Sequence, residues 1–175
     1  NLGNTVDGSV LTNETEAFGN YQSVARSTYL HQGFVRITNN GNGYVGIAGG
    51  TECNVLCNTI KLNVYLERSS GDGNFYSYKK WENVDYNEAS LYMSKEVKVE
   101  KGYYYRLRGY HSCTKSGVTE NGGSVTDGIY NDTVAISKRS PYYTDELKEA
   151  LQQCFINIIN TEKGKEIFGV YKRFE

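Results

Sequence analysis

Apolar and polar residues alternate with a period of two over most of the chain, the spacing that sends successive side chains of a β-strand to opposite faces. The plainest run is 60–67, where four aliphatic residues alternate with Lys61, Asn63, Tyr65 and Glu67. Similar alternation predicts seven strands, at residues 34–38, 45–50, 60–67, 75–81, 91–99, 103–113 and 124–130. The last of these could extend toward Ile136.

Turn signals separate these segments, and no helical period interrupts them. Asn39–Gly43 is the strongest, because Asn and Gly tolerate the positive φ that tight hairpins require. Short strands at regular spacing predict a mainly β protein, an antiparallel β-sandwich, with a Greek-key barrel as the alternative. The stretch Val97–Leu107 resembles the corner of immunoglobulin-like and fibronectin-like domains, where a tyrosine hydroxyl binds nearby backbone.

The two ends of the chain differ from the middle. Residues 1–28 are polar and aperiodic, which predicts an N-terminal arm preceding a sandwich domain at 29–137. Residues 138–175 form a predicted helical appendage with Thr144 as its N-cap. Its apolar residues recur at helical spacing from Leu147 to Ile159, a stripe that we expect to dock onto the sandwich, with a free helix that binds a partner as the alternative.

Composition narrows the class of protein. Sixteen Tyr and nineteen Gly with a single Pro describe a β protein with polar turns, as is common outside the cell. A chain starting at Asn1 fits removal of a signal peptide, so we expect a secreted or cell-surface location. The net charge of −1 does not favour nucleic acid, and every apolar run is far shorter than the ~20 residues that span a bilayer.

Four cysteines are candidates for disulfides in such a compartment. In an immunoglobulin-like order, Cys53 and Cys57 flank one loop and Cys113 opens another at the same end, so Cys113 could pair with either. The remaining cysteine could reach Cys154 on the helix, and the sequence leaves the pairing open. The alternatives are buried free thiols or a zinc site, for which the C-x3-C spacing is suitable but the other ligands are scattered, so we expect no metal.

Catalytic patterns are weak. The two histidines, His31 and His111, lie near predicted strand ends without a nucleophile turn beside them, and Gly41–Gly46 matches a dinucleotide fingerprint only between two strands. We therefore expect no enzyme activity and no cofactor.

Tyrosine and arginine residues on two predicted strands form the best candidate for a ligand-binding surface. Exposed Tyr and Arg rows are common in protein contact surfaces, whereas idle Tyr-rich faces are the alternative. The candidates are Tyr76, Tyr78, Tyr104, Arg106, Arg108, Tyr110 and His111.

Two motifs carry a resemblance to a known family. They are Val64–Arg68 followed by Tyr78–Trp81, and Lys101–His111 followed by Thr126–Ile129. Over about residues 43–130 the chain resembles an uncharacterised family of small secreted β-domain proteins of Gram-positive anaerobes, a domain of unknown function. The resemblance implies export and a compact β-domain, and it implies no activity.

These observations lead to two hypotheses of function. The first is a secreted, non-enzymatic, adhesin-like module that binds a glycan or protein at a cell surface. The second is a structural subunit that assembles with copies of itself by donating a strand from one terminus to a neighbour's sheet edge.

Overall fold

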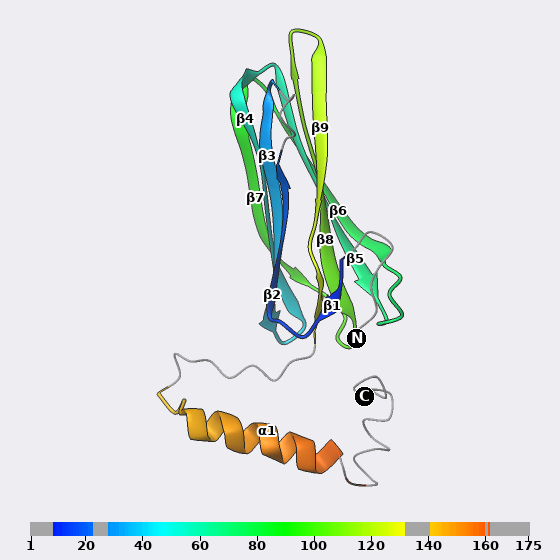
Figure 1. Ribbon diagram of the computed structural model, residues 1–175, viewed down its shortest axis with the longest axis vertical. Helices are drawn as coiled ribbons and strands as arrows, with labels where there is room; N and C mark the ends of the chain where they lie inside the picture. The colour runs from blue at the N-terminus through cyan, green and yellow to red at the C-terminus, as the bar shows by residue number, and fades with distance from the viewer. Residues whose placement is uncertain (1–8, 23–27, 132–140, 160, 162–175) are drawn as a thin grey trace. The chain divides into compact units, whose positions relative to one another are not determined.

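The computed structural model describes residues 9–22, 28–131, 141–159 and 161, which form ten strands and one helix (Figure 1). The chain divides into two compact units, residues 1–133 and 134–175. The predicted boundary at 137/138 lies outside the described residues. The elements are β1 (Leu11–Thr12), β2 (Glu16–Gln22), β3 (Leu30–Gly41), β4 (Tyr44–Cys57), β5 (Thr59–Ser69), β6 (Tyr76–Asp85), β7 (Glu88–Lys98), β8 (Tyr104–Lys115), β9 (Val118–Val125), β10 (Gly128–Tyr130) and α1 (Asp145–Ile159).

The strands of the first unit form two sheets that pack face to face (Figure 1). One sheet has the order β2-β3-β4-β7, and the other has the order β1-β10-β8-β5-β6, with β9 also paired to β8. All pairs are antiparallel except β1 with β10. With β3, β4 and β7 in one sheet and β5, β6, β8 and β9 in the other, the strands are distributed as in immunoglobulin-like sandwiches. The predicted sandwich is confirmed.

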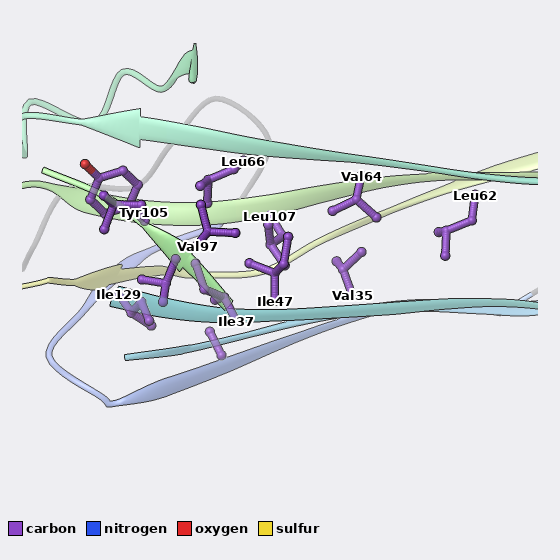
Figure 2. Packing of buried hydrophobic residues seen from close by; sticks show 13 residues of the cluster. Val35, Ile37, Ile47, Leu62, Val64, Leu66, Val97, Tyr105, Leu107 and Ile129 are labelled. Carbon is purple, nitrogen blue, oxygen red and sulfur yellow. The ribbon is translucent and has the colours of Figure 1, made fainter. Parts of the chain in front are cut away.

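The core lies between the sheets and follows directly from the alternating pattern. Figure 2 shows Leu62, Val64 and Leu66 of β5 packing across the interior toward Val35 and Ile47 of the opposite sheet. Each of these five side chains is at most 2% exposed. Full burial of one such side chain contributes about 1.5–3 kcal/mol, so this shared interior fixes which face of every strand turns inward.

The described part of the predicted N-terminal arm belongs to the sandwich, which corrects that prediction for residues 9–22. β2 pairs with β3 along seven residues, from Glu16↔Thr38 to Gln22↔Gln32. Its inward positions include Ala17 and Gly19, which are too small to give a visible hydrophobic alternation. Gly19 is needed because a Cβ there would lie 2.2 Å from the carbonyl oxygen of Val125.

The last predicted strand, 124–130, begins earlier than expected and is interrupted. β9 starts at Val118 after a turn in which Ser116 and Gly117 both have positive φ. Between β9 and β10, the Thr126 amide donates to the Leu107 carbonyl at 2.9 Å, and the Leu107 amide donates to the Thr126 hydroxyl at 3.0 Å. The hydroxyl thus replaces a backbone carbonyl, and the chain can shift its register on β8 by one residue.

The predicted tyrosine corner is present at the start of β8. Tyr105 is completely buried, and its hydroxyl donates to the Glu100 carbonyl, five residues back, at 2.8 Å. The Tyr78 ring packs edge-on against it with ring centroids 5.6 Å apart. Burial raises the pKa of Tyr105 far above the ordinary tyrosine value, so the hydroxyl remains a donor. The corner therefore joins the loop after β7 to the core.

The second unit contains α1. Thr144 caps it as predicted, because the Leu147 amide donates to the Thr144 hydroxyl at 3.0 Å, and Asp145 and Glu146 occupy its acidic first turn. Leu147, Phe155 and Ile158 of its apolar stripe are partly exposed. Docking of this stripe onto the sandwich stays a prediction. Among the described residues, no helix is long and apolar enough to cross a membrane.

Replacing Tyr105 with Phe removes the hydroxyl and leaves the Glu100 carbonyl without this donor. We expect the free energy of unfolding to fall by about 1–2 kcal/mol. Urea denaturation followed by fluorescence measures this change. Tyr76→Phe is the control, because Tyr76 is 66% exposed and should change stability little. Equal effects of the two substitutions would contradict the importance of the corner.

Candidate binding face and buried polar groups

Three aromatic rings lie side by side on the outer face of the four-stranded sheet. Phe18 of β2 and Phe34 of β3 are nearly parallel, with ring centroids 5.7 Å apart. The Tyr92 ring of β7 lies 6.3 Å beyond Phe34. Phe18 and Tyr92 are 53% and 55% exposed, unusually high for large apolar side chains that lie next to one another. We call this set, Phe18, Phe34 and Tyr92, the aromatic row.

The row crosses β4 at a glycine. Phe34, Gly50 and Tyr92 are direct partners across β3, β4 and β7. A Cβ at Gly50 would lie 2.4 Å from the Phe34 ring and 2.6 Å from the Tyr92 ring, so only glycine lets both rings settle over this strand. Strand pairing and this single glycine therefore place the Phe34 and Tyr92 rings next to one another, and Phe18 lies diagonally across from Phe34 on β2.

Planar polar side chains border the row. The Glu52 carboxylate accepts hydrogen bonds from the Tyr92 hydroxyl and from Gln32 Nε2, each at 2.6 Å. Both bonds lower the pKa of Glu52, and the bond between Tyr92 and Glu52 raises the pKa of Tyr92, so the pair is a carboxylate and a neutral phenol at neutral pH. On the opposite side, Arg36 forms an ion pair with Glu16 at the edge strand. Such groups offer both donors and acceptors around an apolar centre.

The residues predicted to bind a ligand divide into two groups. Tyr76, Arg108 and Tyr110 are exposed as expected, and Tyr78 is half-buried against Tyr105. Arg108 and Tyr110 lie on the outer face of the other sheet beside Tyr65 and Asn63, so that face is the second candidate surface. The remaining three, Tyr104, Arg106 and His111, are buried, which corrects their prediction as surface residues.

Arg106 is buried because other segments cover the outer face of β8 at this end. Its guanidinium binds the Glu67 carboxylate at 2.8 Å and the Ser9 hydroxyl at 2.7 Å, and it lies 4.1 Å from the centre of the Phe75 ring. Tyr104 is covered by Tyr130, with ring centroids 4.9 Å apart. Sequence alone could not place these neighbours, since Ser9 is 97 residues away from Arg106.

His111 is fully buried between the two sheets. Its Nδ1 lies 2.9 Å from the Thr51 hydroxyl of β4, and its Nε2 lies 2.8 Å from the Ser124 hydroxyl of β9. Gly33 makes room for the ring, because a Cβ there would lie 2.3 Å from it. Burial lowers the pKa of His111 to about 4, so the imidazole is neutral and bridges the sheets instead of acting as a surface base.

All four cysteines are free thiols, so the predicted disulfides do not form in this structure. The expected proximity at one end of the sandwich is nevertheless present: the sulfur atoms of Cys53, Cys57 and Cys113 all lie within 4.8 Å of one another. Burial raises the pKa of the Cys113 thiol to about 12, and it also raises the pKa of the Cys53 thiol. Cys154 lies apart from them in sequence on α1 and is exposed.

A comparison with known families shows which family the chain belongs to. Residues 3–128 match the model of a family of unknown function, DUF6147, and the chain belongs to that family. The match is wider than the resemblance in the sequence indicated, and it includes β1 and β2. No curated protein is similar to the chain in sequence.

The aromatic row was missed in the sequence because its members come from three separated segments. Phe18 falls in the stretch interpreted as an arm, and Phe34 and Tyr92 each look like ordinary strand residues. The alternation along each strand did give a signal. Phe34 directly precedes Val35, which points into the core, and Tyr92 lies between Leu91 and Met93, which pack against the core. Both aromatic residues therefore had the parity that faces outward.

The low pKa of His111 predicts a specific acid sensitivity. The unfolded chain protonates this histidine near the ordinary value of 6.5, whereas the folded chain does so only near 4. Stability should therefore fall as pH decreases through this window, by up to roughly 3 kcal/mol, and the contribution is complete above it.

Proton NMR titration of the imidazole measures the pKa directly, and denaturation at several pH values measures the linkage. His111→Gln should flatten the slope between these pH values, and His31→Gln should keep it. A His111 signal that titrates near the ordinary value would contradict the assignment.

Proposed function

We propose that the protein is a secreted, non-enzymatic binding module that holds a glycan at a cell surface on its aromatic row. The observation that carries this proposal is the exposure of Phe18 and Tyr92 beside Phe34 on one face of the four-stranded sheet. Apolar side chains of this size rarely lie together in solvent unless they contact a ligand or partner.

The chemistry around the row favours a sugar chain. The C–H faces of pyranose rings pack on aromatic rings, and their hydroxyls bind planar groups that donate and accept hydrogen bonds. Glu52 and Gln32 supply such groups on one side, and Arg36 with Glu16 supplies them on the other. The spacing of successive rings, 5.7 and 6.3 Å, is comparable to the length of one pyranose unit.

A binding role is also supported by where the reactive groups lie. His111 is buried and hydrogen-bonded on both nitrogens, so it is not available to a substrate at the surface. The composition, rich in tyrosine and in glycine turns, supports a location outside the cell. An extended sugar chain would lie along the outer face of the sheet without needing a deep pocket.

Strand donation by the N-terminal segment receives less support. Residues 11–12 pair with β10, and residues 16–22 pair with β3 of the same chain. Both segments are therefore already built into the sheets of their own chain, so we do not propose them as the strand that is donated to a neighbour.

Binding to a panel of polysaccharides and glycan arrays tests the proposal. Phe18→Ala and Tyr92→Ala should each weaken binding on the order of tenfold or more, since truncating a central aromatic anchor removes over 1 kcal/mol. Tyr76→Ala and Tyr86→Ala are matched controls, because both rings are about two-thirds exposed but lie outside the row. No binding to any glycan, or equal losses in controls and row variants, would overturn the assignment.

Gly50→Ala tests the geometry of the row without removing any ring. The added methyl group would overlap the present positions of the Phe34 and Tyr92 rings, so both must move. We expect glycan binding to weaken several-fold while the chain stays folded, as judged by circular dichroism. Gly123→Ala on the other sheet is the control, because a Cβ there meets nothing nearer than 3.7 Å. Unchanged binding by Gly50→Ala would contradict the role of ring placement.

A further inference from the structure

Three thiols from two different sheets meet at one end of the sandwich. Cys53 and Cys57 come from the end of β4, and Cys113 comes from β8. Their sulfur atoms all lie within 4.8 Å of one another. We propose that Cys53, Cys57 and Cys113 form a Zn²⁺ site that joins the two sheets.

The distances suit this ion. Zinc binds thiolates at about 2.3 Å in tetrahedral geometry, which places two sulfur ligands about 3.8 Å apart. The three sulfurs therefore need to approach one another by an ångström or less. The sulfur of Cys113 is buried with that of Cys57, whereas Cys53 is half-buried, so a water molecule can complete the coordination on the Cys53 side.

An irregularity in β4 brings the first two thiols together. Glu52 pairs with Ser90 and Cys57 pairs with Glu88, so four residues of β4, 53–56, stand opposite the single residue Ala89 of β7. The extra residues form a bulge within β4 that brings both ends of the C-x3-C motif close to Cys113. A regular strand would instead carry Cys53 and Cys57 about 13 Å apart along its length.

Neighbouring segments hold this bulge in place. The Asn54 amide donates to the Tyr29 carbonyl at 2.8 Å, and Lys115 Nζ donates to the Leu56 carbonyl at 2.5 Å. Glu120 on the neighbouring strand β9 is the direct partner of Cys113. The Glu120 carboxylate accepts from the backbone amides of residues 28, 29 and 30 at 2.7–2.9 Å, so it organises the surroundings of the site and is not needed as a ligand.

Zinc accounts for all three sulfurs better than the alternatives do. A disulfide would use two thiols and leave the third buried beside it. Binding of Zn²⁺ to three thiols releases three protons and leaves a site with a net charge of −1. A monovalent copper ion with the same thiolates would leave −2 close to the Glu120 carboxylate, which is harder to bury.

Metal titration of the full-length chain tests the site. The protein is reduced with a phosphine, freed of metal by a chelator, and titrated with Zn²⁺ under anaerobic conditions. We expect one zinc ion per chain by elemental analysis, release of protons, and a rise of roughly 5–15 °C in the midpoint of thermal unfolding. Co²⁺ in its place should give the strong near-ultraviolet absorption of cobalt bound to thiolate sulfur.

Variants locate the ion. Cys53→Ser changes the half-buried ligand, so the chain should still fold but should bind zinc at least about a hundredfold more weakly, since losing a group that merely orients a ligand can already cost that much. Cys154→Ser is the matched control on α1 and should bind as the natural chain does.

Several outcomes would overturn the proposal. They are absence of zinc binding by the reduced natural chain, preference for Cu(I) in competition with Zn²⁺, and equal weakening by Cys53→Ser and Cys154→Ser. A disulfide between two of the three cysteines in peptide maps of the exported protein would overturn it as well. Since this site does not include the aromatic row, its failure would leave the glycan proposal untouched.

Discussion

Burial of one side of every strand in a shared apolar interior is the constraint on which the rest of the molecule depends. β5 contributes four fully buried residues at alternate positions, Ile60, Leu62, Val64 and Leu66, and β8 lies directly beside it in register. A shift of one residue in any strand would expose its apolar set to solvent, so the interior fixes the register of both sheets. The same constraint decides which side chains face outward, and the aromatic row is among those.

The fold could be predicted from the sequence because its signals are local and strong. Alternation on β5, the turn at Asn39–Gly43 and the tyrosine corner at Tyr105 each depend on a few neighbouring residues, and each appears as expected. β2 could not be predicted in the same way, since Ala17 and Gly19 occupy its inward positions. Small residues pack there because the opposite sheet comes close. This approach depends on tertiary packing, which the local sequence does not reveal.

The candidate sites depended more heavily on tertiary contacts. Parity correctly placed Arg108 and Tyr110 on the surface, but it failed for Arg106, which Ser9 and Phe75 cover from distant parts of the chain. Proximity of Cys113 to the C-x3-C motif followed from the immunoglobulin-like order. That all three thiols would meet depended on the bulge at residues 53–56 of β4, for which the sequence gives no periodic signal. The aromatic row and this bulge are neighbours on β4, because Glu52 at the edge of the row directly precedes Cys53.

The central claim is that ligand binds on the outer face of the four-stranded sheet. NMR amide shifts of the isotope-labelled chain, followed during titration with a bound oligosaccharide, test this most directly. The account predicts that the largest changes lie at Phe18, Phe34, Gly50, Glu52 and Tyr92, with little change on β5 and β8. Changes centred instead on Tyr65, Arg108 and Tyr110 would assign binding to the opposite sheet and contradict the account.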